Sequence, residues 1–323
     1  TEDTATLFEA IRDIKAAGKA VIFISHKLEE ILALGDVVTV FRNGQKVAFA
    51  NVKDIDIPWI IRKMTGHALN HEKTFFSGKV SEKVLLEVEN LTGDKFYDIS
   101  FRLHEGEILG FAGLVGAGRS EIMQAIFGYT PVYSGEVLVH GQKWKLGDTS
   151  YSVHNGLVYL PEERKKQGIF PILSVKENIS MPLLDKLKAV FTISKKKEDA
   201  LANEVISSYS IKTPDNEKQI KYLSGGNQQK VIIGRAMSCS PKILIFDEPT
   251  KGIDVGTKAE IYSLMQKLAE ENGIGIILIS SELEEIRKCA NRIITFYEGK
   301  KYGEFTSDDS KEAILSAMIG VQQ

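Results

Sequence analysis

Residues 107–127 place a strand pattern, a glycine-rich turn and a helix pattern in direct succession, and this order constrains the fold most. Glu107–Ala112 predicts a strand that runs into Gly113-Leu-Val-Gly-Ala-Gly-Arg-Ser120, and a helix follows to about Phe127. The loop fits the glycine-rich phosphate-binding pattern except at the lysine, where Arg119 stands. A dinucleotide fingerprint would need Gly-x-Gly-x-x-Gly and an acid ending the next strand, and neither is present. For the loop alone, a plain tight turn remains the alternative.

Two further motifs follow the loop along the chain. In Leu223-Ser-Gly-Gly-Asn-Gln-Gln-Lys230, a serine and a glycine pair open a helix predicted over Asn227–Cys239. Backbone N–H donors at such a positive helix end favour an anion. The run Ile243-Leu-Ile-Phe-Asp-Glu-Pro-Thr250 is typical of a buried parallel strand whose carboxyl end delivers Asp247 and Glu248 to a site. In this order, the three motifs indicate a domain that binds and hydrolyses ATP.

These motifs resemble the ATP-binding cassette (ABC) family, and more closely the importer ATPases for simple sugars that carry two cassettes in one polypeptide. Asn227 after the two glycines and Arg119 in the phosphate loop are typical of the second cassette of the sugar and nucleoside import group. The resemblance covers Lys83 to the C-terminus. It implies an α/β fold of the P-loop NTPase class: a mostly parallel sheet, an antiparallel β subdomain and a helical insertion at about 174–221.

Composition agrees with a globular chain and excludes several classes. With 323 residues, 43% of them hydrophobic, and a net charge of −2, the chain can bury one full core and part of another. No apolar stretch approaches the roughly 20 residues that span a bilayer, so we expect any membrane role to come through a partner. The charge argues against nucleic acid as a partner. We expect Cys239 and Cys289 to be buried free thiols, with a redox or metal role as the alternative.

An internal repeat accounts for the amino-terminal part of the chain. Gly18–Ile31 aligns without gaps on Gly273–Ile286. We therefore expect residues 1–68 to be the C-terminal remnant of a first cassette, 69–83 a linker, and 84–323 the second cassette. The coding sequence should then extend upstream of Thr1 through a phosphate loop bearing lysine.

The patterns predict the following elements in this first part: helix 4–17, strand 20–24, helix 27–34, a hairpin over Asn43-Gly44 and a helix opening at Pro58. In the second part, Ser174-Val-Lys-Glu177 predicts a capping box, and a lysine-rich helix is expected around 194–209.

The resemblance assigns roles at the phosphate loop, with ATP and Mg²⁺ as cofactors. The nucleotide-binding residues it implies are Gly113, Leu114, Val115, Gly116, Ala117, Gly118, Arg119, Ser120 and Glu121. Backbone N–H groups should cradle the phosphates, and the Ser120 hydroxyl should hold Mg²⁺. Asp247 should reach the metal through water, and Glu248 should orient and polarise the attacking water as the catalytic residue.

In this family, two cassettes sandwich ATP head to tail, so a signature motif completes the opposite site. The implied signature residues are Leu223, Ser224, Gly225, Gly226, Asn227 and Gln228. They should serve the missing half's site together with the switch histidine His26. In the second cassette the switch position is Ser281, and the loop lysine is Arg119. Removing one such positioned group typically costs roughly 10²- to 10⁴-fold in rate. We therefore expect one working site and one degenerate site.

Two assignments keep alternatives open. Glu162 stands where the family usually places a glutamine that senses nucleotide and touches the membrane partner, so Glu162–Ile169 is a coupling loop or a charged surface loop. Phe96 and Tyr97 are candidates for stacking on adenine, and packing is the alternative.

The function that this resemblance implies is the ATP-hydrolysing subunit of a simple-sugar importer on the cytoplasmic face of the cell membrane. The implied partners are integral-membrane permease subunits, the upstream first cassette and, indirectly, an extracytoplasmic sugar-binding protein. A nucleoside or furanone-like signal (autoinducer-2) is an alternative cargo. Two other classes remain: a tandem-cassette protein acting on ribosomes, against which the short 66–83 stretch argues, and a regulatory cassette that does not hydrolyse ATP.

Overall fold

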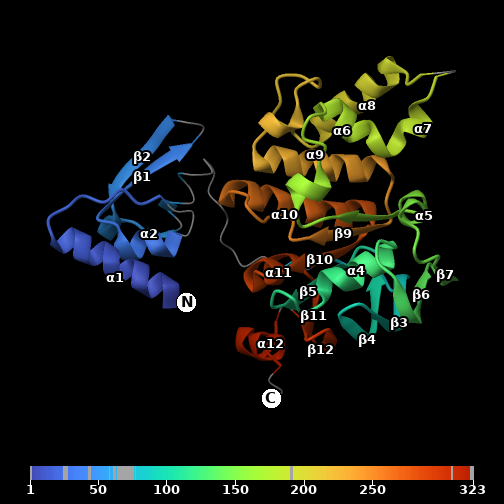
Figure 1. The fold of residues 1–323 in the computed structure, drawn as a ribbon, viewed down its shortest axis with the longest axis horizontal. Coiled ribbons are helices and arrows are strands. Elements are labelled where there is room, and N and C mark those ends of the chain that lie inside the picture. The colour runs from blue at the N-terminus through green and yellow to red at the C-terminus, as the bar shows by residue number, and fades with distance from the viewer. Residues whose placement is uncertain are drawn as a thin grey trace. The chain divides into compact units, whose positions relative to one another are not determined.

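The computed structural model describes residues 2–24, 28–42, 45–57, 59–60, 63, 76, 78–189, 192–306 and 308–320. The chain forms two compact units: Thr1–Glu72 with Asp254–Ala259, and Lys73–Ile253 with Glu260–Gln323. We describe each unit by itself and call them the small unit and the large unit (Figure 1).

The large unit is built on a six-stranded sheet in the order β12-β11-β5-β10-β9-β8. Its strands are β5 (Ile108–Gly113), β8 (Leu157–Leu160), β9 (Ile243–Asp247), β10 (Gly275–Ser280), β11 (Arg292–Tyr297) and β12 (Lys300–Thr306). Neighbouring strands are parallel except β12, which runs antiparallel to β11. Every residue of β5, β9 and β10 is buried, as expected for parallel strands covered on both faces.

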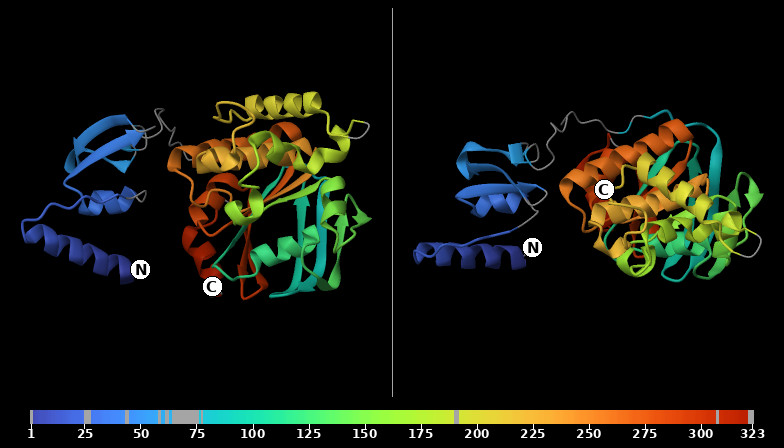
Figure 2. Two further views of the ribbon diagram at one scale, coloured as in Figure 1. Left: turned by 45° about the horizontal axis from the view of Figure 1, so that its top comes forward. Right: turned by 90° about the horizontal axis from the view of Figure 1, so that it is seen from above.

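An antiparallel sheet covers one face of this central sheet. It has the order β4-β3-β6-β7, with β3 (Val84–Gly93), β4 (Phe96–His104), β6 (Val132–Val139) and β7 (Gln142–Lys143). Alternate residues of the central strands, such as Phe111, Ile245 and Ile277, share a core with this sheet and with helix α4 (Arg119–Phe127). Figure 2 shows the two layers from further sides. The predicted mostly parallel sheet and antiparallel β subdomain are therefore confirmed.

Helices cover the other face of the central sheet. They include α6 (Val175–Ser180), α9 (Gly225–Ser238), α10 (Val255–Asn272) from Glu260 onward, α11 (Leu283–Cys289) and α12 (Lys311–Met318). Leu244, Phe246 and Leu278 point to this second core. The remaining elements of the unit are α5 (Thr149–His154), α7 (Leu184–Leu187), α8 (Lys195–Ser208), η3 (Met181–Leu183), η4 (Ile220–Tyr222) and the single π-turn η2 (Arg164–Gly168). None of the helices built from described residues is long and apolar enough to span a membrane.

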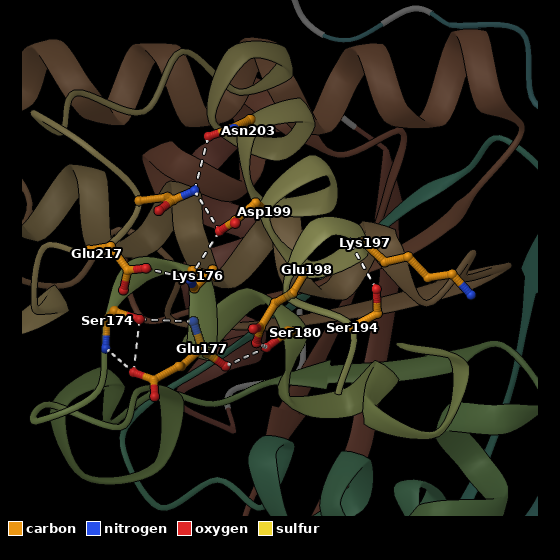
Figure 3. A network of polar contacts seen from close by, with 11 residues as sticks. Ser174, Lys176, Glu177, Ser180, Ser194, Lys197, Glu198, Asp199, Asn203 and Glu217 are labelled. Atoms are coloured by element: carbon orange, nitrogen blue, oxygen red, sulfur yellow. Dashed lines mark hydrogen bonds and ion pairs between the residues drawn. The ribbon is translucent and has the colours of Figure 1, made fainter. Parts of the chain in front are cut away.

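The predicted helical insertion begins with the predicted capping box. The Ser174 hydroxyl accepts a hydrogen bond from the Glu177 backbone N–H, and the Glu177 carboxylate accepts one from the Ser174 backbone N–H (Figure 3). This reciprocal pair satisfies two amides that the first turn of α6 would otherwise leave without partners.

Lys176 then joins three segments of the insertion (Figure 3). Its buried ammonium pairs with Asp199 of α8 at 3.0 Å and with Glu217 in the segment leading to α9. The hydrogen bond from Lys176 to Glu217 is the main cause that raises the pKa of the lysine. The backbone N–H of Lys176 also donates to the Asn216 carbonyl at 2.9 Å. The chain ahead of α9 is thereby fixed onto α6.

Both cysteines, and Phe76 of the predicted linker, belong to the large unit. Both cysteines are free thiols; Cys289 is buried as expected, whereas Cys239 is only partly buried. Phe76, within the stretch predicted as a linker, is buried in the core of the large unit, and its carbonyl accepts a hydrogen bond from the Asn291 side chain.

The small unit contains α1 (Glu2–Ala16), α2 (Leu28–Leu34), β1 (Val37–Arg42), β2 (Gln45–Asn51) and η1 (Val52–Asp54). Strands β1 and β2 pair antiparallel, and Asn43-Gly44 of the predicted hairpin lie outside the described residues. Ile57, Trp59 and Ile60 are helical, as the predicted helix near Pro58 requires.

The repeat seen in the sequence recurs in the backbone. Val37 pairs with Asn51 as Arg292 pairs with Thr306, and both hairpins carry an irregularity at the same place, between Val40 and Phe41 in the small unit and between Thr295 and Phe296 in the large unit. Helices α2 and α11 likewise occupy equivalent positions ahead of their hairpins.

The predicted strand 20–24 is wrong. These residues form no strand, and the side chains of Ile22 and Ile24 are 91% and 92% exposed. The equivalent strand of the large unit, β10, bonds to β5 on one side and β9 on the other. Among the described residues of the small unit there is no counterpart of either neighbour. An apolar run without ladder partners cannot satisfy its backbone groups as a strand.

The capping box generates the first prediction. Ser174→Ala removes both hydroxyl contacts and should lower the free energy of unfolding by about 1 to 2 kcal/mol. Ser194→Ala is the matched control, because Ser194 caps α8 through an exposed contact at 3.5 Å and should cost less. Denaturant unfolding would be followed through buried Trp144 in a Trp59→Phe background. Equal losses in the two variants would contradict the prediction.

Candidate functional site

The phosphate-binding loop predicted from the sequence connects β5 to α4. Gly116 and Gly118 have φ angles of +86° and +91°, which L side chains rarely adopt. A Cβ on Gly118 would lie 2.7 Å from the Lys95 carbonyl oxygen, so this position also lacks space. Leu114, Val115 and Gly116 are exposed at the tip of the loop. The loop and the first turn of α4 therefore present backbone N–H groups suited to an anion.

A turn of the carboxyl-terminal hairpin supports the loop. The Gly299 N–H donates to the Ala117 carbonyl at 3.1 Å, and the Tyr97 N–H donates to the Gly299 carbonyl at 2.8 Å. Phe96 is fully buried in the core, which supports packing, the alternative to its role as a candidate for stacking on adenine. The Tyr97 side chain is 51% exposed beside the loop and remains available to stack.

Asp247 ends strand β9 with a carboxylate that is almost entirely buried. The Tyr159 hydroxyl donates to its Oδ2 at 2.5 Å, and Gln124 donates to that hydroxyl at 3.4 Å. Its Oδ1 is buried and has no hydrogen-bond partner among the described residues. Burial raises the pKa of Asp247 to about 6, although the hydroxyls of Tyr159 and Ser120 act in the opposite direction.

The donor set around Asp247 fits a hard cation. A buried carboxylate oxygen without a donor is an exception that calls for a ligand, and carboxylate and hydroxyl oxygens are typical ligands of Mg²⁺. Ser120 and Asp247, the predicted metal residues, lie close enough for the hydroxyl to affect the carboxylate. These two side chains are the ones whose chemistry suits such a cation.

Glu248 has a strained backbone at the start of the following turn. Its φ angle is +46°, and its N–H donates to the Ile279 carbonyl at 2.9 Å. The Glu248 Oε1 accepts a hydrogen bond from the Ser281 backbone N–H at 2.6 Å, so the structure brings the predicted catalytic and switch positions together. Burial raises the pKa of Glu248, whereas Ser281 and Arg119 lower it.

Arg119 is turned inward from the loop, with its side chain almost fully buried. It donates to the Ser280 carbonyl at 2.5 Å and to the Leu114 carbonyl at 3.5 Å. Its guanidinium also lies 3.9 Å from the Glu248 carboxylate. Burial lowers the pKa of Arg119, and the nearby carboxylates act against that change. The cation that replaces the usual loop lysine is thus engaged with the protein itself.

The signature residues form the start of α9. The Ser224 hydroxyl caps the helix by accepting from the Asn227 N–H, and the Asn227 side chain donates to the same hydroxyl at 2.9 Å. Gln228 donates to the carbonyls of Ile220 and Leu223, each at 3.2 Å. The polar side chains therefore fix the shape of this turn, while Gly225 and Gly226 leave its backbone without side chains.

The remaining predicted residues are placed as follows. Glu162 forms an ion pair with Lys251 at 2.6 Å, and Glu121 lies 3.6 Å from the Lys95 ammonium. His26 lies outside the described residues.

Sequence reasoning missed several polar groups around the site. Tyr159 contacts Asp247, and buried Glu285 accepts hydrogen bonds from Thr250 at 2.9 Å and from Ser280 at 2.5 Å. A tyrosine inside an otherwise aliphatic strand pattern was a usable signal, because a buried hydroxyl requires a partner. Nothing in the sequence pairs Lys251 with Glu162.

The contact between Tyr159 and Asp247 generates the second prediction. Tyr159→Phe removes a donor to the charged carboxylate and should raise the pKa of Asp247 from about 6 by roughly one further unit. The measurement is a pH titration of the carboxyl carbons by NMR. Tyr129→Phe, at an exposed tyrosine, is the control and should leave the midpoint in place. An unchanged midpoint in Tyr159→Phe would show that the Tyr159 hydroxyl does not stabilise the charged form of Asp247, and would contradict the prediction.

Comparison with known proteins gives the same motifs a context. A sequence profile of the ABC transporter family matches residues 96–251. Two proteins of Agrobacterium fabrum are each 39% identical to the chain, and both are named as ribose/galactose/methyl galactoside import ATP-binding proteins. The alignments cover 98% and 99% of this chain but 63% and 64% of those proteins. The chain therefore spans a little under two thirds of the length of these relatives.

Solved structures share the fold. The ATP-binding cassette MJ0796, in a dimeric post-hydrolysis state with ADP and Pi, superimposes with a TM-score of 0.60 at 24% identity, over 70% of this chain and 100% of that one. The cassette MJ1267 in its ADP conformation gives a TM-score of 0.60 at 21% identity, over 73% and 94% of the two chains. Residues 96–251 therefore match the ABC transporter family, and the large unit has the fold of an ATP-binding cassette.

Proposed function

We propose that the chain is part of an ATP-binding and ATP-hydrolysing subunit of an importer for simple sugars, which couples hydrolysis to uptake through a membrane permease. One observation carries the proposal: the phosphate loop, Asp247 and Glu248 meet at the carboxyl ends of the adjacent strands β5, β10 and β9. The names of the two relatives support sugar import as the cargo class.

The chemistry of the site follows from its residues. Backbone N–H groups of the loop would bind the phosphates of ATP. Mg²⁺, when bound by Ser120 and Asp247, would neutralise charge on those phosphates. The raised pKa of Glu248 suits a group that orients water and accepts a proton, and the Ser281 N–H fixes its carboxylate.

Two features support a degenerate site in this cassette. Arg119 is engaged with the Ser280 and Leu114 carbonyls and lies near Glu248, so its charge is already occupied by groups of the protein. Its planar fork also cannot copy a compact ammonium between two phosphates. Ser281 contributes its backbone N–H to Glu248, and its short hydroxyl does not replace an imidazole.

We further propose that residues 1–68 correspond to the end of a first cassette, with 69–83 as linker and 84–323 as the second cassette. The matching hairpin registers of the small and large units support this division. In a head-to-tail sandwich, the signature of the large unit would complete the site of the first cassette. The productive site would then combine the first cassette's loop with Ser224–Asn227 and His26 of this chain.

The segment Glu162–Ile169 is our candidate for coupling to the permease at the cytoplasmic face of the membrane. Glu162 contacts Lys251 in the turn that follows Glu248, and this contact links the segment to the Glu248 turn. Phe170 and Ile172 follow directly and are exposed, with 46% and 72% of their side chains accessible. An extracytoplasmic binding protein would act on this assembly only through the permease.

A regulatory cassette that binds ATP without hydrolysing it is the second candidate. The inward position of Arg119, 3.9 Å from the Glu248 carboxylate, favours this alternative. Steady-state hydrolysis by the full tandem protein separates the two functions, because a regulatory pair of cassettes would not turn over ATP.

The third prediction concerns the chain by itself. It should bind Mg-ATP through its loop but turn it over poorly, because Arg119 and Ser281 replace the groups that act on the γ-phosphate. Calorimetry measures binding, and phosphate release measures turnover. Gly118→Asp is the control that should abolish binding, because a side chain there meets the Lys95 carbonyl. No binding at millimolar ATP, or brisk turnover, would count against the proposal.

The fourth prediction compares two variants in the full tandem protein with its permease. Gly226→Asp places a negative charge where backbone donors should face the γ-phosphate, so transport-coupled hydrolysis should nearly vanish. Glu248→Gln affects only the degenerate site and should cost on the order of a few-fold. If both variants lose activity equally, the model of one working site is wrong and both sites are catalytic.

A further inference from the structure

Arg164 belongs to the coupling segment Glu162–Ile169, and its side chain lies against α9, the helix that carries the signature. Its Nε donates to the Gln228 Oε1 at 3.3 Å. A Cβ on Gly225 would lie 2.9 Å from the Arg164 Nη2, so the guanidinium rests against the first residue of α9. Gln228 also donates to the Ile220 and Leu223 carbonyls. A movement of Arg164 would therefore disturb the hydrogen bonds that fix the signature turn.

A second contact fixes the same segment to the same helix further along. Arg235 of α9 donates to the Gly168 carbonyl at 2.5 Å. A Cβ on Gly168 would come within 2.9 Å of the Ile232 Cδ1, so the backbone of the segment packs directly against this side chain of α9. The π-turn Arg164–Gly168 is therefore held against α9 at both of its ends.

Arg164 differs in its pairing from two nearby lysines, Lys166 and Lys251. Lys166 pairs with Glu163, and Lys251 pairs with Glu162. Within the described part of the chain, no ion pair joins Arg164 to a carboxylate, and burial lowers its pKa. A half-buried charge whose side-chain partner is a single amide oxygen stabilises the fold little, so stability alone does not account for the residue.

At its amino-terminal residue, Glu162, the coupling segment contacts the turn that follows Glu248. Glu162 contacts the Lys251 ammonium at 2.6 Å, and the Lys251 N–H donates to the Glu248 carbonyl at 3.2 Å. The contacts thus run from Glu248 through Lys251 and Glu162, along two residues of backbone, to Arg164 and Gln228. This path joins the site that this cassette forms itself to the signature that serves the facing cassette.

We propose that Arg164 is a positioning residue that transmits the nucleotide state of this cassette's own site to its signature helix. The proposal rests on the proposed function, because it requires Mg-ATP at the phosphate loop. Nucleotide that changes the turn after Glu248 shifts the pair of Lys251 and Glu162. The segment held at Arg164 and Gly168 carries that shift to the first turn of α9. A site with weak turnover would in this way still control the productive site.

Amide hydrogen exchange of Gly225–Gln228, with and without Mg-ATP, tests the proposal in the chain as it exists. The chain is kept at a concentration where light scattering shows a monomer, so that no second copy contacts the signature. In the wild type, Mg-ATP should slow these amides by roughly five-fold, the equivalent of about one net hydrogen bond. In Arg164→Ala, that response should disappear while the affinity for Mg-ATP stays unchanged.

The variants make each outcome decisive. Lys165→Ala removes a neighbouring exposed cation and should respond as the wild type does. Arg164→Lys keeps the charge without the Nε donor and should show a smaller response to Mg-ATP than the wild type. This variant tests the proposal if Arg164→Ala does not fold. A full response in either Arg164 variant, or none in a wild type that binds Mg-ATP, overturns the inference. A wild type that does not bind Mg-ATP refutes the proposed function instead.

Discussion

The register of three buried parallel strands is the constraint on which the site depends. Ala112 of β5 pairs with Ser280 of β10, and Ile279 of β10 pairs with Asp247 of β9. The carboxyl ends of these strands therefore stop at one level, and each continues into a functional segment. Aliphatic side chains on both faces hold this register, because a slip by one residue would turn every side chain to the other face. The loop, the two acids and the switch position follow from that alignment.

This arrangement buries the charged groups of Asp247, Glu248 and Arg119, which costs free energy. Contacts within the site offset part of that cost. Asp247 is stabilised by hydroxyls and keeps a raised pKa, with one oxygen lacking a donor. Glu248 is stabilised by a backbone N–H and by the nearby Arg119. Arg119 in turn binds two backbone carbonyls. Each charge is only partly compensated by the protein, which is the condition under which a bound cation and a polyphosphate have most to contribute.

The small unit separates local from non-local determinants of structure. Helix α2 and the hairpin of β1 and β2 form with the same bounds and irregularity as their equivalents in the large unit, because their hydrogen bonds close within the segment. The run Val21–Ile24 has the same apolar character as β10 but remains irregular, because a central parallel strand takes all its ladder bonds from other segments. Sequence pattern alone does not distinguish the two cases.

The sequence by itself determined the elements and the chemistry whose cause is local. The glycines of the phosphate loop, the capping box at Ser174 and the helix opening at the signature all depend on neighbours within a few residues. The apolar run ending in Asp247 and Glu248 was also visible in the sequence, but it forms a strand only because β8 and β10 lie beside it. Tertiary structure decided what depends on distant segments. It buried Phe96, turned Arg119 toward Ser280, placed Tyr159 on Asp247 and set Arg164 against Gly225. Each of these contacts joins residues far apart in the chain, and a side chain's direction is set by which partner the fold brings within reach.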